Sequence, residues 1–235
     1  MIPNEGKSLT IEVDGRSFQR IPIRTHVVMP PDHLDEFIRQ YARESVKPGD
    51  TLFVTEKIVA ITQGRSFPVD DIRPRALATF LSRYVTKTSH GIGLGIPQTM
   101  EMALRECGTP RILFAAAVAA VTKLVGRRGD FYRIAGNKAR AIDGPTPNTI
   151  PPYNRAVVLG PSQPRRVAAA LRTLLGDDVQ VAIVDINDLG GNVLGSTLSR
   201  PEERQLARIL RDNPLGQDDQ STPLGIVRPV VEPAA

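Results

Sequence analysis

The chain has 235 residues, 41% of them hydrophobic and 23% charged, so it can bury one large core or two smaller ones. Its 30 Lys and Arg and 25 Asp and Glu leave a formal net charge of +5, a mild field that suits phosphorylated small molecules, or carries no functional meaning, rather than nucleic acid. The single cysteine, Cys107, excludes an intramolecular disulfide and a zinc site of four cysteines.

Nothing in the sequence predicts export or a membrane partner. The first residues lack the charged and then apolar layout of a signal peptide. The longest apolar run, residues 112–121, has about half of the ~20 residues that cross a bilayer. We therefore expect a buried helix there and a cytoplasmic protein.

The first half of the chain predicts a β-hairpin followed by strand and helix. Residues 8–23 alternate polar and apolar side chains around Asp14-Gly15, which suits a two-residue turn. Leu34, Phe37, Ile38 and Tyr41 have the spacing of one helix face. Further on we expect a buried strand at 51–54, a segment of ambiguous period up to Gly64, and helices that begin at Arg73 and Pro97.

The second half predicts a sheet with packed helices. We expect strands at 130–136, 155–160 and 179–188, and helices at 164–176 and after Ser199, with Glu202 completing a capping box. Residues 223–231 predict an edge strand, because Pro229 cannot donate to a central ladder. The fold class is therefore mixed α/β (α+β), with a soft boundary between parts 1–128 and 129–235 of one integrated unit.

Several common site motifs are absent. The sequence has no phosphate-binding GxxxxGK[ST] loop, no GxSxG elbow and no HExxH pair among its three histidines. The glycine-rich stretch 90–97 lacks the preceding strand and the later acidic residue of a dinucleotide fold, so we interpret it as a flexible loop. P-loop, zinc-hydrolase and covalent nucleophilic chemistry are therefore disfavoured.

Two aspartates share one setting. Asp143 follows "RAI" and Asp185 follows "VQVAIV", so each carboxylate is expected at the end of an apolar strand, before a loop rich in Asn, Thr, Gly or Pro. Carboxylates that stay ionised side by side need a cation between them. Hard oxygen ligands without thiolate or imidazole suit magnesium or manganese.

A plainer interpretation stays open for each of these residues. An aspartate at a strand end is most often a turn residue that accepts local amide hydrogen bonds. The cluster "DINDLGGN", which adds Asp188, has more oxygen donors than one turn uses. The pairs Arg127-Arg128 and Arg165-Arg166 are either solvated surface or the rim of an anion site.

Four blocks in this order resemble the F420-0 gamma-glutamyl ligase family: "FQRIPIRTHVVMPPDHLDEFI", "GDTLFVTEKIVAITQGRSF", "RAIDGPTPNTIPPYN" and "VQVAIVDINDLGGNVLG". The likeness extends from about residue 18 to 229 and is greatest for a shorter, divergent branch. It implies a GTP-dependent ligase (ATP stays open) that joins L-glutamate to a deazaflavin precursor, with Mg²⁺ or Mn²⁺ as cofactor. It also implies an α/β fold that forms an intertwined homodimer.

The resemblance assigns roles to particular residues. Asp143 and Asp185 match the family's metal-ligating aspartates, and Asp188 is a further candidate ligand. The nucleotide-binding candidates are Ile21, Pro22, Ile23, Glu56, Lys57 and Asn148. The substrate-binding candidates are Arg24, Arg128, Arg140 and Asn154.

The chain departs from the family pattern at three places. Ala60-Ile61 replaces a Ser-Lys pair, so a lysine expected near phosphate is missing, and Lys57, Lys87 or Lys123 would have to substitute. Ile186 replaces a threonine. A proline-rich insert follows Asp143, where its prolines would lower the entropy lost on ordering.

Three hypotheses follow from these observations. The first is a glutamate ligase acting on an anionic small molecule such as F420-0. The second is a ligase of the same fold with another acceptor, which the altered nucleotide residues favour. The third is a nucleotide- or cofactor-binding protein that has lost the reaction, because likeness of fold does not establish chemistry.

Overall fold

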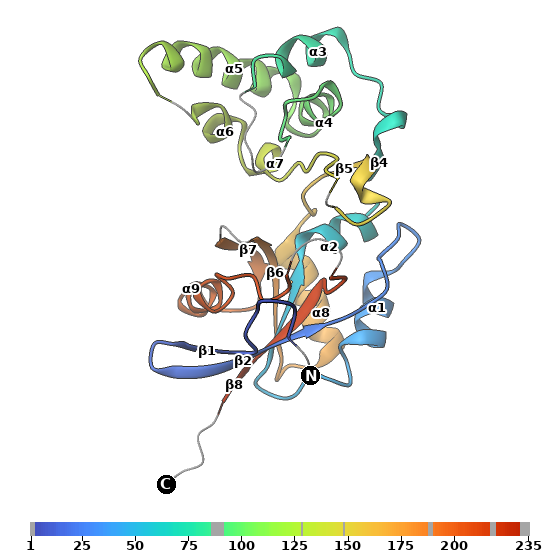
Figure 1. Cartoon of the computed structure of the whole chain (residues 1–235), viewed down its shortest axis with the longest axis vertical. Helices are drawn as coiled ribbons and strands as arrows, with labels where there is room; N and C mark the ends of the chain where they lie inside the picture. Colours follow the sequence, from blue (N-terminus) through green and yellow to red (C-terminus); the bar gives the residue numbers. More distant parts are fainter. Residues whose placement is uncertain are drawn as a thin grey trace. The chain divides into compact units, whose positions relative to one another are not determined.

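The computed structural model describes residues 3–85, 92–127, 129–147, 149–187, 190–216 and 220–230 (Figure 1). The chain forms two compact units. Unit 1 comprises Met1–Gly64 and Pro161–Ala235, and unit 2 comprises Arg65–Gly160. The boundaries between the units, after Gly64 and after Gly160, differ from the soft boundary that we expected near residue 128. Unit 1 is thus assembled from both ends of the chain.

Unit 1 is built on one six-stranded sheet in the order β1-β2-β8-β3-β6-β7. Its strands are β1 Thr10–Val13, β2 Arg16–Ile23, β3 Thr51–Thr55, β6 Gln180–Asn187, β7 Gly190–Ser196 and β8 Leu224–Pro229. Only β3 and β6 pair in parallel, while the other neighbours pair antiparallel. The expected hairpin at 8–23 and the mixed α/β class are confirmed.

The final strand is central, so the expectation of an edge strand at 223–231 is wrong. β8 lies between β2 and β3. Its pairing with β3 ends at Val227, while Pro229, the last residue of the strand, lies opposite Phe18 on β2. The proline therefore lies beyond the part of β8 that needs two neighbouring strands.

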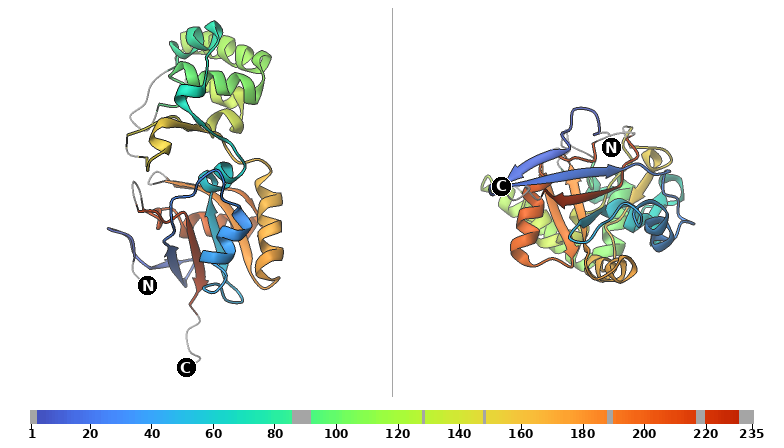
Figure 2. Two further views of the ribbon diagram at one scale, coloured as in Figure 1. Left: turned by 90° about the vertical axis from the view of Figure 1, so that its right-hand side faces the viewer. Right: turned by 90° about the horizontal axis from the view of Figure 1, so that it is seen from below.

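Helices cover both faces of this sheet (Figure 2). Helix α9 (Arg200–Ile209) contacts β7 and β1, the strands at the two ends of the order, so the sheet curls around it. Leu206 and Ile209 of α9 pack with Phe53 and Val184. The opposite face carries α2 (Glu56–Thr62) and α8 (Pro164–Leu175), with α1 (Leu34–Tyr41) packed on both of these helices. The segment of ambiguous period before Gly64 is thus the helix α2.

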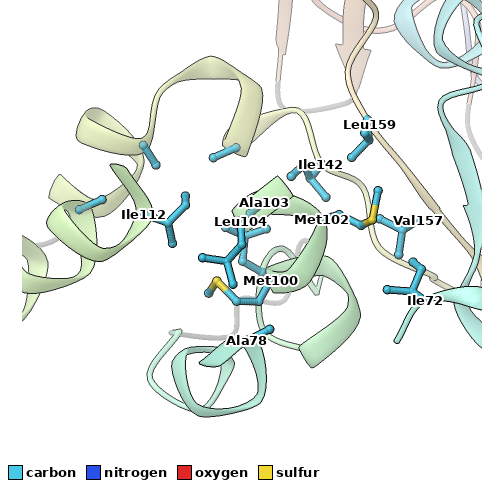
Figure 3. Close-up of a cluster of buried hydrophobic side chains, with 14 residues drawn as sticks. Ile72, Ala78, Met100, Met102, Ala103, Leu104, Ile112, Ile142, Val157 and Leu159 are labelled. Carbon is cyan, nitrogen blue, oxygen red and sulfur yellow. The ribbon is translucent and has the colours of Figure 1, made fainter. Parts of the chain in front are cut away.

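Unit 2 is mainly helical. It contains α3 Ala76–Ser82, α4 Pro97–Cys107, α5 Thr109–Leu124, α6 Asp130–Ala135 and α7 Asn137–Arg140, with the short sheet of β4 Ser66–Pro68 and β5 Ala156–Val158. Met100, Leu104 and Ile112 meet at the centre of its core, and Ile142 and Val157 extend it (Figure 3). Two short 3-10 turns, Val69–Asp71 and Tyr153–Arg155, complete the unit.

Two predictions in unit 2 are wrong. Residues 130–136 are not a strand but the helix α6, in which Ala135 is buried and Phe131 and Ile134 pack against the core, a helical spacing. The run 112–121 is helical, but within α5 only Ile112 and Ala115 are buried. Among the described residues no single helix has the length and apolar composition of a membrane span, which α4 and α5 reach only together, across a 117° bend.

Candidate functional site

One edge of the sheet in unit 1 gathers three of the predicted site segments. Because β8 is antiparallel to both β2 and β3, and β3 is parallel to β6, the strands β2, β3 and β6 all end at this edge. Ile23 and Val54 both pair with Leu224, and Thr55 pairs with Val184. The pairing of β3 with β6 thus ends immediately before Glu56 on one strand and Asp185 on the other. Lys57 follows Glu56 in the first turn of α2. These residues are at the end of the sheet where open sheets bind ligands.

Asp185 lies on the face of the sheet that α2 and α8 cover. Ala182, Val184 and Ile186 pack with the α9 cluster, so the alternation of side chains along β6 places Asp185 on the other face. Asn192 of β7 pairs directly with Asp185. Ile186, which replaces the family's threonine, is thus part of a core rather than of this face.

The beginning of α8 packs closely against the same face. A Cβ atom on Gly195 would lie 2.3 Å from the backbone nitrogen of Arg165 and 2.7 Å from the carbonyl carbon of Pro164. Gly195 pairs with Ile183, two residues before Asp185. The first turn of a helix carries a partial positive charge, so α8 makes this part of the unit favourable for an anion. Arg165 and Arg166 are exposed there.

The donors on this edge fit a magnesium-type cation. Asp185 and Glu56 supply carboxylates and Asn192 supplies an amide oxygen, all hard ligands. Within the described ranges, no three acidic, histidine or cysteine side chains form a metal-binding group. Mg²⁺ commonly takes one or two protein carboxylates and completes its octahedron with water and phosphate oxygens, so a site at this edge stays a prediction.

The segment Ile21–Ile23 is the end of β2. Ile21 is buried, and Arg24, the next residue of the chain, is exposed. The backbone N–H of Arg20 donates to the carbonyl of Leu9 over 2.6 Å, and the pairing with β1 ends at Gln19. Backbone groups alternate in direction along a strand, so the carbonyl of Pro22 points to the same side as the N–H of Arg20. At Pro22 this side is beyond the paired residues of β1. That backbone groups of this segment meet a nucleotide stays a prediction.

Asp143 belongs to unit 2, where it extends the small sheet. Its N–H donates to the carbonyl of Val158 over 2.8 Å, and the N–H of Val158 donates back over 3.0 Å. The carboxylate is exposed. A Cβ atom on Gly144 would lie 3.1 Å from Cγ2 of Thr99 and 3.4 Å from Cβ of Ile92. Asp143 is thus next to the first turn of α4 and the loop before it.

The described residues of the proline-rich insert after Asp143 contact one another. The hydroxyls of Thr146 and Thr149 lie 2.6 Å apart, and the N–H of Thr149 donates to the carbonyl of Thr146. Tyr153 is buried and Asn154 is half-buried. The peptide bond between Pro151 and Pro152 is cis. The described parts of the insert, 144–147 and 149–155, thus lead from Asp143 back to β5.

Tyr132 is a polar neighbour of this region that sequence reasoning missed. Its hydroxyl receives a hydrogen bond from the backbone of Leu94, and a Cβ atom on Gly93 would lie 3.0 Å from it. Burial raises the pKa of Tyr132, and the nearby Arg140 opposes that shift. The only signal for Tyr132 was its place in residues 130–136, which we interpreted as a strand. The glycine-rich loop thus contacts a half-buried phenol near Arg140.

The remaining predicted residues are placed as follows. Asp188, Asn148, Arg128 and Lys87 lie outside the described residues. Asp143 belongs to unit 2 and Asp185 to unit 1, so their convergence stays a prediction. Ala60 and Ile61 are buried core residues of α2, while Lys123 is exposed near the end of α5. Lys57, in the first turn of α2, is the candidate lysine that belongs to the same edge as Asp185.

The sequence matches the family model described as F420-0:Gamma-glutamyl ligase over residues 22–193. The matched range includes the edge of unit 1, Asp143 and Asp185. No curated protein matches the chain. Because the match covers well over half of the 235 residues, the chain belongs to the F420-0:gamma-glutamyl ligase family.

Proposed function

We propose that this protein is a nucleotide- and metal-dependent amide ligase that adds L-glutamate to an anionic small molecule such as F420-0. The family supports a glutamate ligase role. The observation that carries the finer statement is the shared edge in unit 1, where the ends of β2, β3 and β6 bring Ile21–Ile23, Glu56, Lys57 and Asp185 together. GTP is the nucleotide that the resemblance implies, with ATP as the alternative.

The proposed division of labour follows the chemistry of each side chain. Asp185 and Glu56 of unit 1 and Asp143 of unit 2 would hold Mg²⁺ or Mn²⁺ with the nucleotide phosphates, and Asp188 is a further proposed ligand. The metal would neutralise the charge that builds up on the transferred phosphoryl group. Lys57 and the first turn of α8 would stabilise the phosphates electrostatically. Arg24, Arg128, Arg140, Asn148 and Asn154 would orient the acceptor and nucleotide.

The proposed reaction has two steps. The acceptor carboxylate attacks the γ-phosphorus, which forms an acyl phosphate and releases the nucleoside diphosphate. The amine of glutamate then attacks the acyl carbon, phosphate leaves, and the nitrogen loses a proton. The residues of this chain would mainly hold the reacting groups in line and exclude water, which is how phosphoryl transfer is usually accelerated.

A second candidate is a ligase of the same fold with a different acceptor. Ala60 and Ile61 occupy the positions of the family's Ser-Lys pair, and both are buried in the core of unit 1. A lysine side chain at either of these two buried positions would have to bury its charge unfavourably, so the phosphates would have to be met by a cation from another position, such as Lys57. The nucleotide contacts of this chain therefore differ from the family pattern, and the acceptor can differ as well.

We also propose a cytoplasmic homodimer. The homodimer follows from the resemblance, and the cytoplasm is where the proposed substrates and metal, GTP, glutamate and magnesium, occur together.

Calorimetry with GTP and ATP, with and without Mn²⁺, tests the site. We expect metal-dependent nucleotide binding that Asp185→Asn and Asp143→Asn each weaken at least about tenfold, a loss of about 1.4 kcal/mol. Asp177→Asn is the matched control, because this side chain is 96% exposed in unit 1 and belongs to no proposed site. Metal-dependent binding that both site substitutions leave unchanged would rule out the site.

Phosphate release in the presence of a panel of acceptors separates the candidates. Release that requires L-glutamate and F420-0 supports the first function. Release that requires an amino acid and another acceptor supports the second. Nucleotide binding without any release under these conditions supports the non-catalytic hypothesis.

A further inference from the structure

Unit 2 brings the phenol of Tyr132 close to the guanidinium of Arg140. Tyr132 belongs to α6 and Arg140 to α7, two short helices that only Gly136 separates (Figure 1). Helix α6 packs on α5, and α7 packs on α4. The framework of unit 2 therefore holds the backbone of both residues in place.

The protein itself orients the ring of Tyr132. The ring packs against the core of unit 2 and meets the ring of Phe131 edge to face, with centroids 5.3 Å apart. Its oxygen lies at the turn of residues 92–95, where the N–H of Leu94 donates to it. Gly93 of this turn has a φ of +50°, and a Cβ atom on it would lie 3.0 Å from the phenol oxygen. This close approach therefore requires glycine.

The hydroxyl of Tyr132 has a proton left to donate. A phenol can both accept and donate a hydrogen bond, and Leu94 uses only the accepting side. In the part of the chain that the structure describes, no group accepts the hydroxyl proton. Burial raises the pKa of Tyr132, so the phenol stays protonated and adds no negative charge at neutral pH. An oxygen of a ligand can therefore accept this proton in place of water.

Arg140 supplies a positive charge next to this donor. It is exposed and forms no ion pair with any residue that the structure describes. Arg133 of the preceding helix, by contrast, pairs with Asp130 over 3.0 Å. Guanidinium N–H groups form a fixed fork that matches the oxygens of carboxylates and phosphates. Tyr132 and Arg140 together therefore have the donors of an oxyanion site.

The turn beside Tyr132 also connects this pair to Asp143. A Cβ atom on Gly144, the residue after Asp143, would lie 3.4 Å from Cβ of Ile92. Ile92 is the first residue of the turn, and Gly93, which contacts Tyr132, is the second. A group bound by the pair would thus lie beside the same turn as the carboxylate that we propose as a metal ligand.

We propose that Tyr132 and Arg140 bind an oxyanion group, a carboxylate or a phosphate, of a small-molecule substrate, with the phenol donating to one oxygen and the guanidinium to another. This inference rests on the proposed function, to which it adds Tyr132 as a binding residue. The anionic acceptor and L-glutamate both carry oxyanion groups. The experiments below distinguish these two sources.

The chain has four tyrosines, so NMR of labelled tyrosine gives a direct test. With ¹³C at Cζ, each tyrosine of the full chain gives one signal, and Tyr132→Phe identifies that of Tyr132. We expect this signal to shift when inorganic phosphate is added without nucleotide or metal, and Arg140→Gln to weaken the apparent affinity at least about tenfold. The signal of Tyr84, which is 69% exposed in the same unit, should not shift and is the internal control.

The same titration identifies the source of the oxyanion. A shift with F420-0 at lower concentrations than with L-glutamate assigns the group to the acceptor, and the reverse order assigns it to the amino acid. These shifts are measured without nucleotide or turnover. A failure of the proposed ligation and a failure of this site are therefore distinguishable.

Kinetics test the role of the hydroxyl in the proposed reaction. Tyr132→Phe removes the hydroxyl and keeps the ring, so urea unfolding should match the parent. The KM of the substrate that shifts the Tyr132 signal should rise at least about tenfold, while the affinity for GTP and Mn²⁺ stays unchanged. A merely structural role would instead lower stability. Tyr84→Phe, the matched control, should leave both KM and stability unchanged.

Several outcomes would overturn the proposal. One is a Tyr132 signal that phosphate, L-glutamate and F420-0 all leave in place. Equal shifts of the Tyr132 and Tyr84 signals would show non-specific binding, and a shift with phosphate that neither substrate reproduces would exclude a substrate site. An unchanged KM in Tyr132→Phe would exclude a role of the hydroxyl.

Discussion

The two units bury their apolar side chains to different extents. In the described part of the chain nine large hydrophobic side chains are exposed, and seven of them belong to unit 2: Phe80, Tyr84, Leu113, Phe114, Val121, Leu124 and Val125. Unit 1 has a curled sheet with helices on both faces, so each strand is covered within the unit. In unit 2, helix α5 packs against α4 and α6, and only Ile112 and Ala115 of this helix are buried. The difference indicates that unit 1 is complete by itself, while unit 2 leaves more of its large apolar side chains exposed.

The units also differ in charge. Residues 65–160 hold 14 of the 30 Lys and Arg but only 6 of the 25 Asp and Glu. The mild net charge of the whole chain therefore conceals a strongly basic unit 2 beside a slightly acidic unit 1. A basic unit raises the local concentration of anions. In the proposed enzyme, unit 1 would supply the framework of the nucleotide site and unit 2 would attract the anionic acceptor.

The largest effect is expected for Gly195→Ala in unit 1. The new Cβ would lie 2.3 Å from the backbone of Arg165 in α8, and backbone atoms cannot move aside as a flexible side chain can. We expect a loss of about 3 kcal/mol or more in the free energy of unfolding of unit 1. Urea unfolding followed by circular dichroism measures the loss, and hydrogen exchange assigns it to peptides of α8 and β7.

The same experiment tests whether the units are independent. Peptides of α4 and α5 should keep the exchange protection of the parent, because Gly195 and its contacts belong to unit 1. Equal loss of protection in both units would show that they unfold together, which would contradict the view that unit 1 is complete by itself.

Local signals predicted much of the fold, but pairing over long range was not readable from the sequence. Asp14-Gly15 marked the hairpin correctly, and both residues have the positive φ that such a turn needs. Pro229 suggested an edge strand because a sequence does not show how far a pairing extends. Residues 130–136 suggested a strand because their aromatic and β-branched side chains favour strands, whereas packing against α5 makes them helical.

The candidate site was likewise predictable from local sequence only in part. The position of Asp185 at a strand end was readable from the apolar run before it. That β2, β3 and β6 end at one edge was not, since this depends on β8 inserting between β2 and β3. Tyr132 was missed for the same reason as α6. Whether Asp143 and Asp185 share one metal stays a prediction.

A smaller effect is expected for Glu101→Gln, which tests how unit 2 stabilises its helices. Glu101 of α4 is 2% exposed and accepts hydrogen bonds from Arg105 and from both the backbone and the guanidinium of Arg75, the residue before α3. Its carboxylate thus caps a helix that is distant in sequence. We expect the substitution to cost unit 2 about 2 kcal/mol, discounted because both arginines are half-exposed.

The pH dependence of this effect has a definite sign. Burial raises the pKa of Glu101, but the hydrogen bonds from Arg75 and Arg105 outweigh it and hold the pKa below the ordinary value of 4.5. A carboxyl with a lowered pKa stabilises the fold above its unfolded pKa, and this contribution is lost as the pH falls through the folded value. Glu101→Gln should therefore flatten the loss of stability below about pH 4.5. Asp70→Asn, in an exposed pair with Arg155, should not change it.

The smallest effect is expected for Ser199→Ala, which removes a local cap in unit 1. At the start of α9, the N–H of Ser199 donates to Glu202 over 2.8 Å, and the hydroxyl of Ser199 completes the capping box. Loss of this hydroxyl should cost about 1 kcal/mol in urea unfolding, while Ser45→Ala, at an exposed turn, should change stability by less than about 0.5 kcal/mol. The cap of α9 is made within four residues, whereas that of α3 comes from another helix. A cost for Ser199→Ala that equals the cost for Glu101→Gln would contradict this contrast between local capping in unit 1 and tertiary capping in unit 2.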